Sequence, residues 1–250
     1  MKVSSTIITL NEERNIERCI LSLQKVSDEI IVLDSFSTDR TEEICQKLNV
    51  RFVQRKWSGY AASKNHLNSL ASYDYILSID ADEVLDDALE NAILEIKKKD
   101  KPQLYSVNRL TNYCGKWIKH SGWYPDVKLR LFPKESCQWE GEFVHEELSF
   151  PTDLEIIQLD GHLHHYSYYD YIDHRQRADK YSTLTAQKMN KAGKKASVLK
   201  PFLSGFARFV GMFIIKLGFL DGWQGFKIAQ ISAQSNVFKY KELRRLNKEK

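Results

Sequence analysis

The sequence predicts an α/β protein in which a mostly parallel β-sheet is flanked by helices and followed by a helical C-terminal appendage. Over the first hundred residues, short apolar runs rich in β-branched residues alternate with segments of helical apolar spacing. This alternation is typical of a parallel sheet covered on both faces. The charge is divided unevenly. Residues 188–250 hold 14 Lys and Arg against 3 Asp and Glu, whereas residues 1–187 hold 23 against 30, so the net charge of +4 averages a basic tail and an acidic body.

Residues 1–100 predict four strands with helices between them. The strands are the apolar runs at 3–9, 29–33, 50–53 and 75–79. The first helix is expected from Ile16, Cys19, Ile20 and Leu23, because their i, i+3, i+4, i+7 spacing places them on one helix face. Later helices are expected around residues 44–48, 64–71 and 86–99. Since crossovers between parallel strands are right-handed, few topologies remain.

A second set of strands is expected after residue 101. These strands are at 104–110, 128–132 and 161–167, and a loop rich in Trp, Tyr, Gly and Lys separates the first two. From Tyr169 onward the pattern is mostly helical. We therefore expect a domain at 1–168, with halves 1–100 and 101–168, and a separate appendage at 169–250.

Carboxylates follow three of the expected strands. Glu12 follows the first strand, Asp34 and Asp39 follow the second, and Asp80 ends the fourth. Ligands of open α/β sheets bind beyond the carboxyl ends of the strands, so these side chains can converge on one crevice. Two structural roles are alternatives. Glu12 can be a first-turn acid favoured by the helix dipole, and Asp39 can cap the second helix.

Asp80 and Asp82 form a D-x-D motif after the fourth strand. A carboxylate at the end of an apolar run is costly unless it is paired or binds a cation. In extended chain both side chains point to one face, which suits Mg²⁺ or Mn²⁺ with diphosphate oxygens completing the shell. A solvated acidic face is the alternative. No glycine-rich phosphate loop is present, which argues against a dinucleotide dehydrogenase and a P-loop enzyme.

These motifs resemble those of the family 2 glycosyltransferases of the GT-A fold. The matching segments of the first half are Ile7-Ile8-Thr9-Leu10-Asn11-Glu12, Asp34-Ser35-Phe36-Ser37-Thr38-Asp39, Lys64-Asn65 and Asp80-Ala81-Asp82-Glu83. The rest of the chain is similar to the lipopolysaccharide core-type subgroup. Its matching segments are Gly122-Trp123-Tyr124-Pro125-Asp126, Arg130-Leu131-Phe132, Val144-His145-Glu146-Glu147 and Gly218-Phe219-Leu220-Asp221-Gly222. One departure is Ser35-Phe36, where many relatives carry Asp-Gly.

The resemblance implies an inverting transfer from a nucleotide-diphosphate sugar, with a UDP-sugar as the expected donor. The donor-binding residues that it implies are Thr9, Glu12, Asp34, Asp39, Lys64, Asp80 and Arg130. Asp82 and Asp80 would hold Mg²⁺ or Mn²⁺ on the diphosphate, where the metal neutralises charge that grows in the transition state. An exposed helix lysine is the alternative role for Lys64.

Inversion also needs a base opposite the leaving group, to take a proton from the acceptor hydroxyl. Relatives place a carboxylate there, well after the D-x-D motif. Glu146 is the first candidate, Glu147 the second and Asp126 the third. Adjacent residues on a strand face opposite ways, so only one of the two glutamates can point into the cleft. A surface acidic pair is the alternative.

Three histidines crowd the strand expected at 161–167. His162 and His164 share a face of that strand. The resemblance implies that a histidine here, such as His164, completes the metal shell. The alternative is a packed or surface histidine.

The tail contains an apolar segment at residues 202–220, interrupted by Arg208 and Lys216. Charges at the centre of a membrane span cost about 2.5–3.5 kcal/mol each on insertion scales, so a span is disfavoured. Ser204, Arg208 and Lys216 share one helix face, and the opposite face is apolar. We therefore expect one amphipathic helix in the membrane interface, with anionic lipid attracted by Lys194, Lys195, Lys200, Arg244 and Arg245. A helix packed on the catalytic domain or on a dimer partner is the alternative.

Together these features predict a metal-dependent, inverting glycosyltransferase that extends a lipid-linked glycan of the lipopolysaccharide core type. The enzyme alternative is a nucleotidyltransferase, and the non-enzyme alternative is an inactive membrane-bound glycan-binding module. No signal peptide is evident and the four cysteines form no metal or disulfide pattern, so we expect a cytoplasmic protein peripheral to the inner face of the membrane. Cys19 and Cys45 are expected in the core. No nucleic-acid partner is expected, because no nucleic-acid-binding motif is present.

Overall fold

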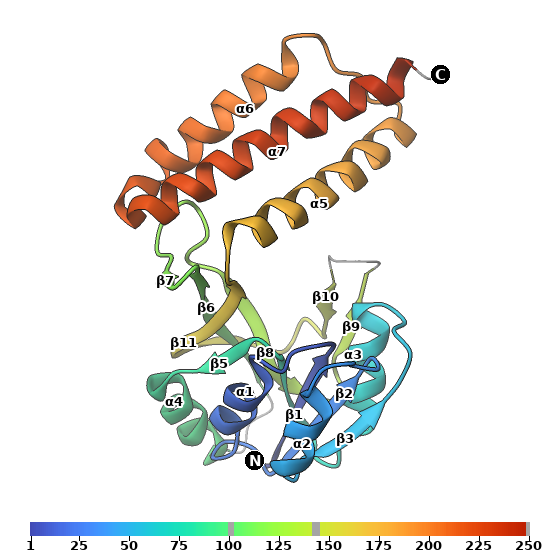
Figure 1. Ribbon diagram of the computed structural model, residues 1–250. Coiled ribbons are helices and arrows are strands. Elements are labelled where there is room, and N and C mark those ends of the chain that lie inside the picture. Colours follow the sequence, from blue (N-terminus) through green and yellow to red (C-terminus); the bar gives the residue numbers. More distant parts are fainter. Residues whose placement is uncertain (100–102, 142–145, 249–250) are drawn as a thin grey trace. The chain divides into compact units, whose positions relative to one another are not determined.

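The computed structural model describes residues 1–99, 103–141 and 146–248, and it divides into two compact units (Figure 1). Unit 1 comprises residues 1–109 and 126–166, and unit 2 comprises residues 110–125 and 167–250. The sequence expectation grouped residues 110–125 with the α/β domain. In the structure these residues belong instead to the same compact unit as the C-terminal helices.

Unit 1 is built on a mixed sheet with the strand order β3-β2-β1-β4-β8-β6-β11-β5. Its parallel part comprises β1 (Val3–Thr9), β2 (Glu29–Asp34), β3 (Arg51–Gln54) and β4 (Tyr75–Asp80). Its antiparallel pairings involve β5 (Glu83–Leu85), β6 (Leu104–Tyr113), β8 (Val127–Pro133) and β11 (Ile156–Tyr168). The predicted fold class, a sheet flanked by helices, is confirmed, but the sheet is mixed rather than mostly parallel, because the strands after residue 80 pair antiparallel.

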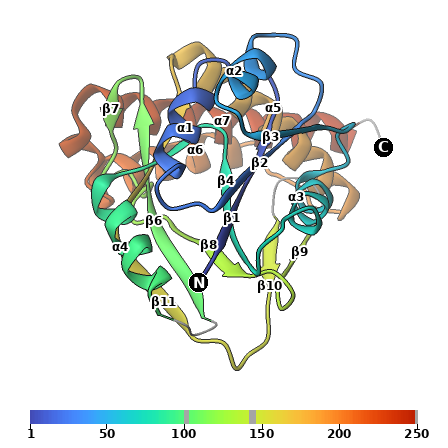
Figure 2. The same cartoon turned by 90° about the horizontal axis from the view of Figure 1, so that it is seen from below.

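Helices cover both faces of this sheet. They are α1 (Ile16–Leu23), α2 (Thr41–Lys47), α3 (Tyr60–Ser69) and α4 (Asp87–Lys97). Both views place α3 beside the small sheet of β9 (Gln138–Glu140) and β10 (Glu147–Ser149), on the side away from α4 (Figures 1 and 2). Asp86 caps α4 by accepting a hydrogen bond from the Leu89 N–H.

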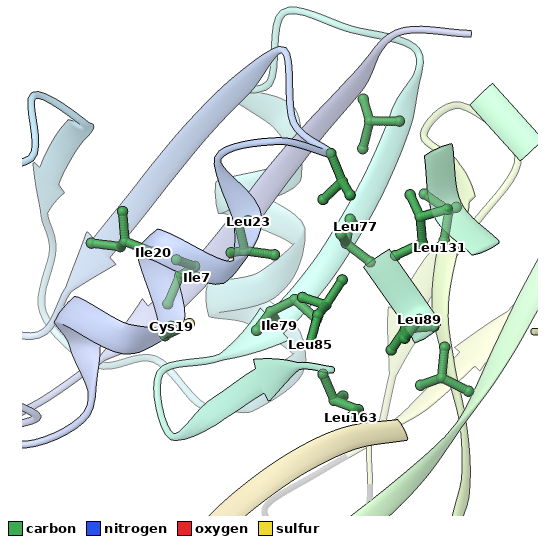
Figure 3. Packing of buried hydrophobic residues seen from close by; sticks show 14 of the residues in the cluster. Ile7, Cys19, Ile20, Leu23, Leu77, Ile79, Leu85, Leu89, Leu131 and Leu163 are labelled. Atoms are coloured by element: carbon green, nitrogen blue, oxygen red, sulfur yellow. The ribbon is translucent and has the colours of Figure 1, made fainter. Parts of the chain in front are cut away.

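The core follows the alternation of side chains along the strands. Ile7 and Ile79 pack with Ile20 and Leu23 of α1 in one cluster (Figure 3). Ile31 and Leu33, which neighbour Val32 of that cluster, point to the other face and pack with Leu67 of α3. Both faces of the parallel strands are therefore buried, as their continuous apolar runs predict. Cys19 and Cys45 are buried in the core, as expected.

Unit 2 consists of three long helical segments and a strand-and-loop segment. The helices are α5 (Tyr171–Lys191), α6 (Lys200–Val210) and α7 (Gly222–Lys248), and β7 (Lys116–Trp117) pairs with the end of β6. Tyr113 is fully buried among the rings of Trp123, Tyr168, Tyr171 and His174. This aromatic cluster joins residues 110–125 to the C-terminal helices.

The single amphipathic helix expected at 202–220 is not formed. The α-helix ends at Val210, a π-helical turn η1 (Gly211–Ile215) follows, and a 3-10 turn η2 (Gly218–Asp221) leads into α7. Leu217 between the two turns has a φ of 53°, which ends helical hydrogen bonding there. Within the described residues, no helix has the length and apolarity to cross a membrane by itself. The segments Lys200–Ile215 and Gly218–Lys248 reach those criteria only together, with a 73° bend between them.

Candidate active site

The carboxyl ends of β1, β2 and β4 bring three predicted site residues together. Thr9 is in register with Asp34 on the neighbouring strand, and Ile8 is in register with Asp80 on the other side. The Thr9 hydroxyl is buried and makes no hydrogen bond to any residue that the structure describes. The end of β1 thus presents an unused polar group between two carboxylates.

Asp34 organises the loop that follows β2. Its carboxylate is fully buried and accepts hydrogen bonds from the Ser37 N–H at 2.9 Å and the Ser37 hydroxyl at 2.5 Å. The Ser37 hydroxyl in turn accepts from the Asn11 N–H at 2.8 Å. This ties the loop after β2 to the loop after β1. Phe36, at the position where many relatives carry Gly, has a φ of 66° and is half exposed.

Asp39 and Glu12 connect the same two loops. Asp39 accepts hydrogen bonds from the Thr41 N–H at 3.0 Å and the Glu13 N–H at 3.0 Å. Although burial opposes ionisation, these hydrogen bonds and that of the Thr41 hydroxyl lower the pKa of Asp39. The Glu12 N–H donates to the Thr41 hydroxyl at 2.9 Å, and the Glu12 carboxylate accepts from Asn15 at 2.6 Å. Both acids therefore have structural partners, but not in the roles weighed above, since the N-cap of α2 is Arg40 and the first-turn acid of α1 is Glu17.

Asp80 lies between two buried cations. Its Oδ2 is 2.8 Å from Nη2 of Arg130, and its Oδ1 is 3.2 Å from Nζ of Lys64. The side chains of Arg130 and Lys64 are only 4 % and 3 % exposed, so Lys64 is not an exposed helix lysine. Although burial opposes ionisation, the charges of Lys64 and Arg130 hold the pKa of Asp80 far below its usual range.

Glu83 and Arg109 extend this ion-pair network, and the sequence did not single out either as a site residue. Glu83 is fully buried, and its Oε1 lies 2.5 Å from Nη2 of Arg130 and 3.4 Å from Nη1 of Arg109. The other carboxylate oxygen accepts from the Asp80 N–H at 3.0 Å. The signal that pointed to Glu83 was its place in the segment Asp80-Ala81-Asp82-Glu83.

Asp82 pairs with a histidine rather than with the arginines of this network. The chain turns after Asp80 rather than remaining extended, and the Asp82 carboxylate lies 3.2 Å from Nε2 of His165 on β11. Burial opposes its ionisation, but the interaction with His165 lowers the pKa of Asp82. His162 instead contacts Asp86 at 3.2 Å, and His164 stacks on His162. The structure thus brings His165, rather than His164, to Asp82.

The three candidate bases lie in different environments. Glu146 Oε1 is 3.3 Å from the same Lys64 Nζ that contacts Asp80, and this amine also lies 4.7 Å from the centre of the Trp139 ring. Glu147 is exposed on β10. Asp126 forms ion pairs with Arg109 at 2.7 Å and Lys128 at 3.0 Å. Of the three, Glu146 is therefore the one that shares a partner with Asp80.

Across residues 1–99, 103–141 and 146–248, no group of three or more His, Cys, Asp or Glu side chains is arranged to hold a metal ion. Asp82 and His165 nevertheless offer a carboxylate and an imidazole nitrogen close together, and the Asp82 side chain is 21 % exposed. A carboxylate and an imidazole can serve as two ligands of a divalent cation, whose other positions would be open to ligands from outside this pair.

Comparison with known proteins identifies sequence relatives over nearly the whole chain. Residues 4–167 match the family described as Glycosyl transferase family 2. The chain is 31 % identical to an uncharacterized glycosyltransferase of Rickettsia typhi, over 98 % of this chain and 88 % of that protein. It is 29 % identical to the lipopolysaccharide core biosynthesis glycosyltransferase LpsC of Rhizobium meliloti, over 80 % of this chain and 76 % of that protein.

One solved structure is similar over part of the chain. Glucosyl-3-phosphoglycerate synthase of Mycobacterium tuberculosis, in complex with Mn²⁺, UDP and phosphoglyceric acid, aligns at 24 % identity and a TM-score of 0.38. That alignment covers 44 % of this chain and 43 % of that one.

Proposed function

This chain belongs to glycosyl transferase family 2 and is a glycosyltransferase, and on that premise we propose that it transfers a sugar from a UDP-sugar to a lipid-linked glycan of the lipopolysaccharide core type, with inversion. The observation that carries the proposal is the position of Lys64, whose amine contacts both Asp80 and Glu146. One buried cation thus connects a strand-end carboxylate of the predicted donor site to the predicted base.

The donor half of the site is assigned to the strand ends. Thr9 and Asp34 would contact the nucleoside, with Glu12 and Asp39 holding the two loops in register. Both oxygens of Asp80 are engaged by Lys64 and Arg130, so we assign to Asp80 the positioning of these cations toward the diphosphate. Cations placed where leaving-group charge develops lower the barrier to departure.

Asp82 and His165 are the residues that would hold Mg²⁺ or Mn²⁺ in this proposal. His165 takes the place that the sequence analysis gave to His164, because His165 is the histidine in contact with Asp82. When bound, the divalent cation would neutralise negative charge on the departing diphosphate.

Glu146 is assigned as the base. It would accept the proton of the acceptor hydroxyl as the acceptor oxygen bonds to the anomeric carbon and the bond to the diphosphate oxygen breaks. The Lys64 amine lies 3.3 Å from its Oε1 and also contacts Asp80. Glu147 and Asp126 lack this connection to Asp80.

The adjacent glutamates provide a matched test. The purified full chain is incubated with a panel of nucleotide sugars and a divalent cation, and donor hydrolysis, in which water replaces the acceptor, is measured. E146Q should lower the rate about 100-fold or more, within the usual contribution of a general base, whereas E147Q removes the same charge one residue away and should leave the rate close to that of the wild type.

The products distinguish the enzyme classes. A released nucleoside diphosphate supports glycosyl transfer, whereas a new sugar nucleotide with pyrophosphate would identify a nucleotidyltransferase. Equal rates for E146Q and E147Q would refute the assignment of the base.

We also propose that the chain works at the cytoplasmic face of a membrane, where a lipid-linked acceptor is presented. The support is the large number of exposed apolar side chains in unit 2. Phe202, Leu203 and Phe206 of α6 are each more than half exposed. Such side chains favour the interfacial region of a bilayer.

A further inference from the structure

The bend between α6 and α7 carries six exposed apolar side chains within ten residues. Each of them is 45–73 % exposed, and we call this set the bend surface: Ile214, Ile215, Leu217, Phe219, Leu220 and Trp223. Soluble monomers rarely expose large contiguous apolar patches, and those that exist usually mark interaction sites. The position of the bend, at the end of the α6–α7 hairpin, is visible in Figure 1.

Three lysines accompany the bend surface. Lys216 belongs to the bend itself, and Lys116 and Lys119 come from the segment that includes β7. A Cβ atom added to Gly122 would lie 2.6 Å from Nζ of Lys216, and one added to Gly222 would lie 3.3 Å from Nζ of Lys116. The amines of Lys216 and Lys116 therefore lie where these two segments meet, and Lys119 is tied to the same place through its backbone N–H, which donates to Asp221. None of the three lysines forms an ion pair with a residue in the described ranges.

Asp221 stabilises the contact between these two segments without forming an ion pair with the three lysines. It is the sole acid within residues 110–125 and 211–225, and it is 2 % exposed. Its carboxylate accepts from the N–H groups of Lys119 at 3.2 Å and His120 at 3.0 Å, and it contacts Nδ1 of His120 at 3.0 Å. The Ser121 N–H donates to the Lys216 carbonyl at 2.9 Å. The one carboxylate is thus used internally and pairs with none of the three lysine amines, of which Lys119 and Lys216 belong to exposed residues.

We propose that the bend surface, together with Lys116, Lys119 and Lys216, docks onto a bilayer that contains anionic phospholipid. The apolar side chains enter the interface and the lysine amines bind lipid phosphates. This inference deepens the membrane-surface part of the proposed function and rests on it. It differs from the sequence expectation, which gave the electrostatic contacts to Lys194, Lys195, Lys200, Arg244 and Arg245.

Charge also argues against a second copy of the chain as the partner that covers the bend surface. A symmetric dimer is self-complementary, so each surface patch meets the same patch of the partner. Pairing through the bend surface would place the three lysines of each copy against those of the other. Like charges brought together in this way oppose association, whereas anionic lipid compensates them.

Vesicle sedimentation of the full chain tests the proposal. Vesicles of phosphatidylcholine alone are compared with vesicles of phosphatidylcholine and phosphatidylglycerol, for the wild type and for K116Q/K119Q/K216Q. The triple variant should bind the anionic vesicles about 100-fold more weakly, since each lysine near such a surface contributes about 1 kcal/mol and 1.4 kcal/mol is a factor of ten. I215S/L220S should also lose binding, without loss of thermal stability, because both side chains are exposed.

K188Q/K191Q/K194Q is the matched control, because it removes three charges from exposed lysines of unit 2 outside the bend. It should bind the anionic vesicles like the wild type. The proposal is overturned if the control and K116Q/K119Q/K216Q weaken binding equally, if neither does, or if the chain dimerises through the bend instead of binding vesicles. Donor hydrolysis without vesicles separates the two proposals: a chain that docks but hydrolyses no nucleotide sugar retains this inference and refutes glycosyl transfer.

Discussion

Glu83 is the carboxylate that pairs with both arginines of the candidate site. It is fully buried, contacts Arg130 and Arg109, and accepts a hydrogen bond from the Asp80 N–H. Removing one partner of a buried ion pair typically costs 3–5 kcal/mol, because the other charge is left uncompensated. Glu83→Gln should therefore lower the free energy of unfolding by about 3 kcal/mol, measured by urea denaturation at neutral pH.

The matched control for that substitution is Glu90→Gln. Glu90 pairs with Lys25, whose side chain is 71 % exposed, and exposed pairs contribute little to stability. Its unfolding midpoint should stay close to that of the wild type. If Glu83→Gln were equally mild, Glu83 would not be the partner that stabilises Arg130.

The contacts of individual side chains in the candidate site could be predicted from the sequence only in part. Asp80, Lys64 and Arg130 were each predicted to bind the donor, but their mutual pairing depends on strand order, because β8 with Arg130 lies next to β4 with Asp80. Glu83 was overlooked since its sequence position suggested a solvated acidic run. The choice of His165 over His164 depends on the register of β11 against β5, which pairs His165 with Glu83 next to Asp82. A one-residue change of register would reverse it.

Helix α5 carries a pH-sensitive contact through His174. This side chain is 6 % exposed, its Nδ1 lies 2.7 Å from the Tyr113 hydroxyl, and burial lowers its pKa to about 4. The unfolded state, with a pKa near 6.5, binds a proton that the folded state rejects. The free energy of unfolding should therefore fall by about 3 kcal/mol as the pH drops from 6.5 to 4, and this contribution should level off below pH 4.

Urea unfolding of the wild type and of His174→Gln at pH 7 and pH 5 tests this linkage. The loss of stability between the two pH values should be smaller in His174→Gln, because glutamine does not titrate. His66→Gln on α3 should retain the full loss. An identical loss in His174→Gln and the wild type would assign the acid sensitivity to other groups.

At the scale of elements, the strands and helices of the first hundred residues were predictable because each has a clear apolar period. The tail was not. Its apolar run gave no sign of the break at Leu217, which depends on a close approach: a Cβ atom on Gly225 would overlap the Gly218 carbonyl oxygen. Glycines that permit contact between distant turns have no local periodic signal.

At the scale of the whole molecule, residues 110–125 fold with the C-terminal part. Tyr113 and Ile118 are fully buried in one cluster with Met212, Ile228 and Ala229. A chain ending at residue 168, the predicted domain boundary, would expose Tyr113 and Ile118 to solvent. We expect such a chain to aggregate or to bind a hydrophobic dye, as measured by light scattering and dye fluorescence after purification.

The counterpart to that truncation removes residues 110–125 as well, by joining Arg109 to Asp126 through a short glycine-rich linker and ending at Tyr166. It should be more soluble than the chain that ends at residue 168. Equal solubility of both would mean that residues 110–125 do not need the C-terminal helices. The strand-like pattern of residues 104–113 runs across Arg109 without a break, so it carries no local signal of the division between the two units.

The path of the chain between the two units has a consequence for recombination. The chain leaves unit 1 after Arg109, returns at Asp126 and leaves again after Tyr166. Any exchange of unit 2 between relatives must therefore transplant two separate stretches at once. A single-crossover chimera would join residues 110–125 of one parent to the C-terminal helices of another. A graft with three junctions would instead take the whole aromatic cluster around Tyr113 from one parent.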